Sequence, residues 1–168
     1  MLKSTREDIA YVTPDDAANA DGRISEYSYF VEGNQVVKSV NTYDVLKRIS
    51  QKAVTLNAKS ISKVFAYDKT RLSEYNDAFG QTSLGEYHLT YDQLGRISGQ
   101  ERRIAGSVHT FTYVYDIYGQ LIRENNPDVN RTFAYSYDSI GNITSVKEYP
   151  YTLDTLPTNA SSTKSLYL

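Results

Sequence analysis

Apolar and polar residues alternate along most of this chain, and the clearest runs carry an aromatic or leucine residue at every second position. A period of two places the side chains of such a run on one face of a β-strand. The pattern predicts roughly eleven strands between about residue 23 and residue 149, and no segment has a helical period. We therefore expect an all-β protein. The runs are Phe65-x-Tyr67, Tyr87-x-Leu89-x-Tyr91, Phe111-x-Tyr113-x-Tyr115 and Phe133-x-Tyr135-x-Tyr137.

The dipeptide Tyr-Asp recurs along the chain at intervals of 24, 24, 24 and 22 residues. Such nearly constant spacing indicates tandem copies of one supersecondary unit. A β-hairpin fits the length of each unit, and stacked hairpins place their aromatic residues in a continuous ladder. The chain therefore contains about five to six repeats of about 24 residues. The pairs are Tyr43-Asp44, Tyr67-Asp68, Tyr91-Asp92, Tyr115-Asp116 and Tyr137-Asp138.

The three C-terminal repeats place a glycine three residues after the aspartate, at Gly95, Gly119 and Gly141. Asp and Gly at this spacing predict a three-residue hairpin loop, in which a left-handed residue closes a type I turn and forms a bulge. The aspartate accepts backbone N–H bonds inside such a turn. An earlier copy has Lys47 in place of glycine. That conformation costs about 1 kcal/mol for lysine, unless the turn differs. The copy at 67–72 is one residue shorter.

Two flanking segments fall outside the repeat pattern. Residues 1–21 form a polar lead-in, and the repeat region spans residues 22–149. Residues 150–168 contain two prolines and a cluster of Thr, Ser and Asn, which is typical of a loop. We expect this loop to run toward a strand at residues 165–168, the start of a truncated further unit.

Composition and charge narrow the range of functions. The chain has 18 Lys+Arg against 20 Asp+Glu, so it lacks the basic field that captures nucleic acid. Cysteine is absent, which excludes disulfides and thiolate metal sites. No apolar run approaches the ~20 residues that span a bilayer, so we expect no membrane insertion. Tyrosine accounts for 16 of the 168 residues. Its apolar ring and polar hydroxyl suit a sheet face that is partly exposed to water.

No arrangement of residues indicates catalysis. Each repeated aspartate is alone in its unit, whereas calcium needs six or more converging oxygens, so turn capping is the favoured role and no metal is expected. His88 and His109 have no Glu or His at metal-ligand spacing and are expected on the outer face of the sheet. Nucleophile elbows and phosphate loops are absent. We therefore predict a protein that is not an enzyme and binds no cofactor.

The aromatic residues that precede the turns allow two interpretations. They line the sheet or form its core, which their recurrence in register at every unit favours. Alternatively, they bind carbohydrate, because exposed rings stack on sugar faces and phenol groups bond to sugar oxygens. The residues concerned are Tyr87, Phe111, Tyr113, Phe133 and Tyr135.

Three sequence cores resemble the YD-repeat family, also called Rhs repeats: YDQLGRI at 91–97, which includes Arg96, YDIYGQL at 115–121 and YDSIGNI at 137–143. The resemblance covers about residues 22–149 and is weaker in the two earlier copies. In this family, tandem antiparallel hairpins form a curved or spiralling sheet, a segment of a β-shell. Such shells occur in bacterial polymorphic toxins, insecticidal toxin complexes and teneurins.

The resemblance implies a non-catalytic structural segment of a shell that encapsulates or presents a C-terminal toxin or effector. The Asp-Pro-x-Gly-Leu self-cleavage motif of bacterial shells is missing from this sequence. The implied partners are adjacent YD repeats of the parent chain, self-association through sheet edges, and toxin cargo. The implied location is secreted or at the cell surface. The alternative is a secreted or cell-surface module that binds glycans or a receptor through its Tyr-rich sheet.

Overall fold

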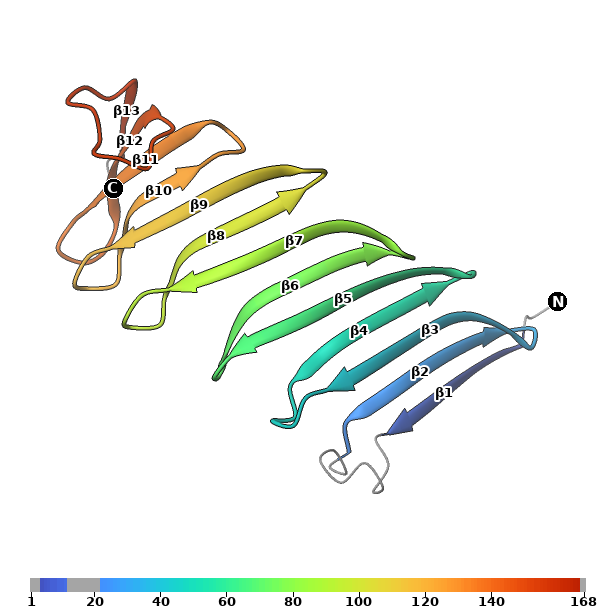
Figure 1. The fold of residues 1–168 in the computed structure, drawn as a ribbon. Helices are drawn as coiled ribbons and strands as arrows, with labels where there is room; N and C mark the ends of the chain where they lie inside the picture. Colours follow the sequence, from blue (N-terminus) through green and yellow to red (C-terminus); the bar gives the residue numbers. More distant parts are fainter. Residues whose placement is uncertain (1–3, 12–21, 167–168) are drawn as a thin grey trace. The chain divides into compact units, whose positions relative to one another are not determined.

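The computed structural model describes residues 4–11 and 22–166 of the chain. The strands are β1 (Thr5–Tyr11), β2 (Ile24–Val31), β3 (Asn34–Tyr43), β4 (Ile49–Leu56), β5 (Lys59–Asp68), β6 (Arg71–Phe79), β7 (Thr82–Tyr91), β8 (Ile97–Ile104), β9 (Ser107–Tyr115), β10 (Leu121–Asn126), β11 (Arg131–Tyr137), β12 (Ile143–Pro150) and β13 (Ser162–Ser165). The described residues contain no helix (Figure 1), so the all-β prediction is confirmed. The eleven strands β2 to β12 agree in number with those expected from the alternating pattern.

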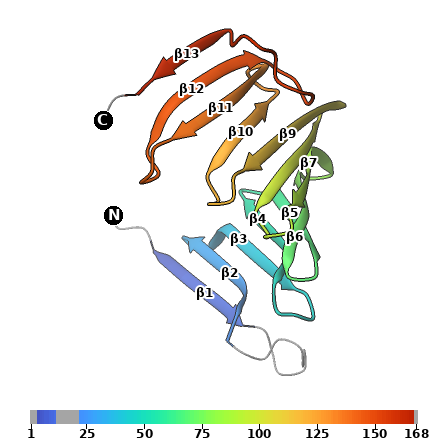
Figure 2. The ribbon, with the colours of Figure 1, turned by 90° about the vertical axis from the view of Figure 1, so that its left-hand side faces the viewer.

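The strands fall into two compact units, Met1–Glu86 and Tyr87–Leu168, and β7 spans the division between them. In the first unit, β1 to β6 follow sequence order, and each strand is antiparallel to the next. In the second unit, β8 to β13 follow the same rule. Figure 2 shows β9 to β12 side by side, with β13 beyond β12. Tandem antiparallel hairpins are therefore the building block of each unit.

The turns that begin at Asp44, Asp92, Asp116 and Asp138 have the predicted geometry. Gly95 has a φ of 86°, and its N–H donates to the carbonyl of Asp92 at 3.0 Å, which closes a turn. The N–H of Asp92 donates to the carbonyl of Arg96 at 2.9 Å and joins the strands on either side. Lys47 adopts the same left-handed conformation with a φ of 69°, so the earlier turn keeps its shape in spite of the side chain.

The pairing register shifts at the tyrosine that precedes these turns. The shifts lie between Thr42 and Tyr43 and between Ser136 and Tyr137. One extra residue on one strand is the mark of a β-bulge, as the sequence predicted for these loops.

At the opposite end of the hairpins, Asn57-Ala58 and Ala105-Gly106 have positive φ at both residues. Positive φ at both positions defines a type I′ turn, whose twist matches that of the flanking strands.

The sheet has very little hydrophobic core. Among the described residues, the buried apolar side chains are Phe111 and Tyr149, and the buried polar ones are Ser28, Asn125 and Thr132. Large apolar residues such as Val64 and Leu84 stay exposed on the strands. Each unit therefore relies on contacts between neighbouring strands within one layer rather than on packing between layers.

Residues 151–154 fold back onto the sheet of the second unit. The phenol of Tyr151 donates to the carbonyl of Thr110 at 2.6 Å, and the N–H of Thr152 donates to Oγ1 of Thr132 at 3.0 Å. The guanidinium of Arg123 donates to the carbonyl of Thr152 at 2.7 Å. This segment covers Thr132, which has no exposed surface.

The strand expected at residues 165–168 lies elsewhere. β13 begins at Ser162, because Glu148 of β12 pairs with Ser162 and the N–H of Ser161 donates to the carbonyl of Glu148. Residues 167–168 lie outside the described residues. The prediction was therefore wrong by three residues at the start of the strand, and the cause is this pairing across the sheet.

At the other end of the chain, β1 lies within residues 1–21, for which the sequence predicts a polar lead-in. It pairs with β2 from Thr5↔Val31 to Tyr11↔Ile24. All of its residues are exposed, which explains why alternation did not reveal it. No helix in the described part of the chain is long and apolar enough to cross a membrane.

Candidate functional site

The aspartate of each Tyr-Asp pair caps its own turn. Oδ1 of Asp92 accepts the backbone N–H groups of Leu94 and Arg96, both at 2.9 Å. Burial opposes ionisation of Asp92, but the backbone and side-chain hydrogen bonds from Arg96 outweigh it and hold the pKa of Asp92 below its usual value. Oδ1 likewise accepts the backbone N–H groups two and four residues further along the chain at Asp44, Asp116 and Asp138. These carboxylates are thus engaged in shaping turns. Asp68 is the last residue of β5, and a shorter turn leads from it to Arg71 of β6.

The tyrosines of four of the Tyr-Asp pairs bond to the preceding repeat. The phenol of Tyr115 donates to the carbonyl of Ile97 at 2.9 Å, and the phenol of Tyr67 donates to the carbonyl of Ile49 at 2.8 Å. Tyr43 reaches the carbonyl of Ile24 and Tyr137 reaches that of Leu121. In every case the accepting carbonyl belongs to the first residue of the strand that follows the turn of the preceding repeat. These tyrosines therefore join one hairpin to the next.

An arginine directly after the turn completes the link. Nε of Arg96 donates to Oδ2 of Asp92 at 2.6 Å, and its Cζ atom lies 4.5 Å from the ring centre of Tyr115. Nη1 of Arg96 then donates to the carbonyl of Asp116 in the next turn at 3.2 Å. The guanidinium thus holds its own turn, the next tyrosine and the next turn together. We call this arrangement of Asp, Arg and the next Tyr the arginine clip.

Two earlier repeats contain equivalent contacts. Cζ of Arg48 lies 4.0 Å from the ring centre of Tyr67, and its Nε donates to Asp44 at 2.7 Å. Cζ of Arg23 lies 4.4 Å from the ring centre of Tyr43. Arg96 belongs to the predicted motif without a predicted role, and the motif residues predicted from the sequence do not include Arg23 and Arg48. The available signal was an arginine that directly precedes Ile or Leu in four successive cores, at positions 23, 48, 71 and 96.

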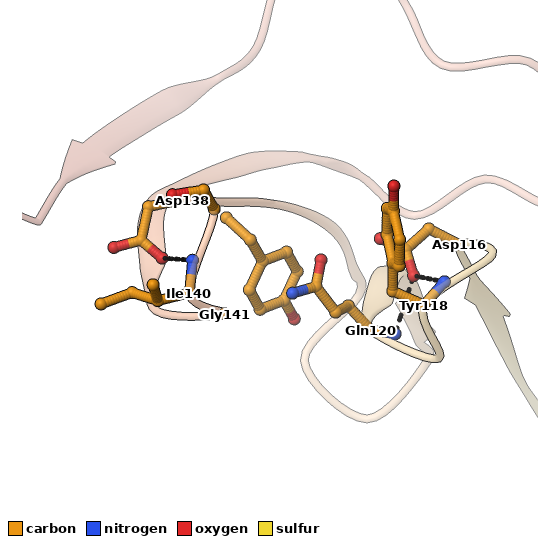
Figure 3. A pocket seen from close by; sticks show the side chains of 8 residues that line it. Asp116, Tyr118, Gln120, Asp138, Ile140 and Gly141 are labelled. Atoms are coloured by element: carbon orange, nitrogen blue, oxygen red, sulfur yellow. Dashed lines mark hydrogen bonds between the residues drawn. The ribbon is translucent and has the colours of Figure 1, made fainter.

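The next repeat interrupts this series, because Gln120 stands at the arginine position. A cavity of about 620 Å³ opens there between two successive turns (Figure 3). Figure 3 shows the side chain of Gln120 between the turn of Asp116 and the turn of Asp138. The cavity is lined by Asp116, Tyr118, Gln120, Tyr137, Asp138, Ser139, Ile140 and Gly141.

Part of the predicted aromatic face surrounds a carboxylate. Tyr113 and Phe133 pair with Glu124 from either side, and the phenol of Tyr135 donates to Oε2 of Glu124 at 3.1 Å. Burial and the negative charge of Glu124 raise the pKa of Tyr135 to about 12, and the same causes raise the pKa of Tyr113. Tyr113 and Tyr135 are half-buried.

The remaining residues of that face differ in burial. Phe111 is buried, with the guanidinium of Arg102 over its ring at 5.2 Å. Tyr87 is half-buried and lies in β7. The alternation of aromatic residues therefore identified one face of the strands, but the burial of each ring depends on its neighbours in the sheet.

The predicted position of His109 was wrong. Positions 109, 111 and 113 share one face of β9, because alternate residues of a strand point the same way. Nδ1 of His109 lies 3.0 Å from Oδ1 of Asp128, which also accepts a bond from Arg102. Sequence spacing did not indicate this cluster, because Asp128 comes from the turn between β10 and β11.

The structure also contains a buried polar cluster that the sequence does not predict. Thr132 donates to Oδ1 of Asn125 at 2.9 Å, and Nδ2 of Asn125 donates to Thr112. Asn125 and Thr132 are 2% and 0% exposed. No group of three or more potential metal ligands occurs within the described ranges. The bonds among Thr112, Asn125 and Thr132 therefore join β9, β10 and β11.

Comparison with known proteins identifies the class of protein. Residues 65–157 match the family described as "Teneurin YD-shell", and this stretch is more than half of the chain. The turn capping, the tyrosine bonds and the arginine clips all fall on the residues of the repeated core. The chain belongs to the YD-shell family, and the repeats are structural elements of such a shell.

A solved structure is also similar. The crystal structure of "TcdB2-TccC3 without hypervariable C-terminal region" aligns with 96% of this chain at 15% identity and a TM-score of 0.49. The chain spans 11% of the length of that structure. No curated protein matches the sequence.

Proposed function

We propose that this chain is a non-catalytic segment of the wall of a YD shell, and that the shell encapsulates or presents a C-terminal toxin or effector of the same polypeptide. The observation that carries the proposal is the recurrence of the arginine clip and the tyrosine bond in successive repeats. Within each unit, hairpins are fastened to one another through such contacts, for example Arg96 with Tyr115. A wall built in this way holds together without a thick core.

The adjacent repeats of the parent chain are the first proposed partners. β1 pairs with β2 on one side, and β13 pairs with β12. Unpaired strand edges bind other strands readily, so they suit either the preceding and following turns of a wall or self-association of an isolated segment. The proposed location of the parent protein is secreted or at the cell surface.

The size of the native protein is the first test. An antibody against residues 22–149 detects the product in its source cells, and the proposal requires a mass many times 19.0 kDa. The second test is limited proteolysis of that parent protein. An enclosed C-terminal segment resists protease until the shell is denatured. A 19 kDa product, or a C-terminal segment cut equally fast before and after denaturation, contradicts the proposal.

A second candidate function is binding of glycans or a receptor through the Tyr-rich sheet. It is favoured by Tyr113 and Tyr135 on either side of Glu124, because rings stack on sugars and a carboxylate accepts sugar hydroxyls. A glycan array with the wild-type chain and with Tyr113→Ser and Tyr135→Ser tests it. Loss of binding in folded variants supports this function, with Tyr118→Ser as the matched control. Equal binding by all forms, or none, contradicts it.

A further inference from the structure

The cavity beside Gln120 occupies the position that an arginine fills in the preceding repeat. In that repeat, the guanidinium of Arg96 meets three groups: Oδ2 of Asp92, the ring of Tyr115 and the carbonyl of Asp116. One repeat further along, the counterparts of these groups are Asp116, Tyr137 and Asp138. All three counterparts line the cavity.

Gln120 replaces the missing guanidinium only in part. Its Nε2 atom lies near Gly141, as Nη1 of Arg96 lies near Gly119, but a glutamine side chain is shorter, carries no charge and has two N–H donors where arginine has five. Within the described residues, neither the Gln120 amide nor Oδ2 of Asp116 forms a hydrogen bond. By contrast, Oδ2 of Asp138 accepts a bond from the side chain of Asn142 at 2.9 Å. The cavity therefore presents an unpaired carboxylate oxygen at the place where other repeats hold a cation.

We propose that this cavity is a binding site for a guanidinium group, supplied by an arginine side chain of another polypeptide segment. The ring of Tyr137 offers a flat surface for stacking, Oδ2 of Asp116 offers a charged acceptor, and Oε1 of Gln120 offers a neutral acceptor. The electrostatics agree with this assignment. Burial raises the pKa of the Tyr137 phenol and the negative charge of Asp116 adds to the effect, so the charge of Asp116 acts on a ring that lines the cavity.

The geometry favours arginine over lysine. Guanidinium is planar, carries five donors and stacks on aromatic rings, whereas an ammonium group is a compact, strongly hydrated charge. The surroundings favour a peptide over a free small molecule. Tyr118 and Ile140 beside the cavity are 83% and 82% exposed, and apolar neighbours of an incoming arginine would cover them.

Nuclear magnetic resonance of the labelled chain tests the proposal, with N-acetyl-arginine amide as the probe. We expect saturable shifts confined to the Tyr137 ring and to the backbone N–H groups of Gly119 and Gly141. N-acetyl-lysine amide should bind at least several-fold more weakly. Absence of saturable shifts, or equal binding of the two probes, overturns the proposal.

Two matched variants sharpen the test. Gln120→Arg fills the cavity with a guanidinium of the chain itself and should abolish binding of the probe. Arg96→Gln leaves Asp92 and Tyr115 in place and should create a second site, with new shifts at the Tyr115 ring. The backbone spectrum reports whether each variant is folded. A folded Gln120→Arg that binds as well as wild type, or a folded Arg96→Gln without a second site, overturns the proposal.

A further comparison identifies the source of the arginine. A short peptide with a central arginine flanked by leucines should bind more tightly than N-acetyl-arginine amide. Ile140→Ser should weaken the peptide and leave the amide unchanged. Equal affinities of the peptide and the amide would overturn the assignment to a polypeptide.

Discussion

The guanidinium of Arg96 lies over the ring of Tyr115, and the phenol of Tyr115 donates a hydrogen bond to the carbonyl of Ile97, the neighbour of Arg96. The two residues are 19 positions apart and belong to successive repeats. Their contacts therefore join hairpins rather than strands of one hairpin. In a chain of repeats, such nearest-neighbour contacts supply much of the stability. They matter more here because few apolar side chains are buried.

Removal of the Tyr115 hydroxyl should weaken the link between two hairpins. Tyr115→Phe keeps the ring under Arg96 and loses the bond to Ile97. We expect the free energy of unfolding in urea to fall by about 1 kcal/mol. Tyr118→Phe is the control, because the Tyr118 side chain is exposed and should tolerate the change. Equal effects of the two substitutions would mean that the bond contributes nothing.

Lys47→Gly should stabilise the protein. Lys47 has a φ of 69° in a turn where the later repeats carry glycine, and relief of that strain is worth about 1 kcal/mol. Arg23 donates to the carbonyl of Lys47 rather than to its side chain, so the contact persists. The reverse change, Gly95→Lys, should lower the urea midpoint. A lower midpoint for Lys47→Gly would show that the side chain contributes more than the strain costs.

The titration of Tyr135 should appear in the alkaline stability of the protein. Its pKa is raised from 10.0 to about 12 by burial and by Glu124. Because the pKa is higher in the folded state, the stabilising contribution is complete below pH 10 and is lost as the pH rises through 12. Phenolate absorbance measures the titration directly. Glu124→Gln should lower the pKa of Tyr135, and an unchanged titration curve would contradict the assigned cause.

Thr132→Val should be strongly destabilising despite its similar volume. The Oγ1 atom of Thr132 bonds to Asn125 and to the N–H of Thr152, and the side chain has no exposed surface. Loss of these bonds leaves buried polar groups unpaired and should cost about 1–3 kcal/mol. Amide exchange at Thr152 should also accelerate. Thr163→Val, at an exposed position of β13, is the matched control, and equal stability of both variants would contradict this account.

Local chemistry explains how much of the fold the sequence predicted. Alternation of aromatic residues predicted the strands, and the spacing of Asp92 and Gly95 predicted a capped turn closed by a left-handed residue, both of which the structure contains. These signals act over a few residues, so they are readable without knowledge of neighbouring strands. The repeated cores also led to the YD-shell family, which the match over residues 65–157 confirms.

The candidate site depended on longer-range contacts. The clip between Arg96 and Tyr115 and the cavity beside Gln120 require the register between successive hairpins. The contact of His109 with Asp128 likewise joins β9 to a distant turn. Sequence spacing gives the residue types at these places but not their juxtaposition across the sheet.

By itself, the sequence determined the repeat, the strands, the turn chemistry and the family of this protein. Tertiary structure alone decided which groups meet across repeats, and how residues 151–154 cover Thr132. The physical reason is the range of the interactions. Turn capping and left-handed φ are satisfied within five residues, whereas the bond from Tyr151 to the carbonyl of Thr110 spans 41 positions and exists only because the intervening strands fold between them.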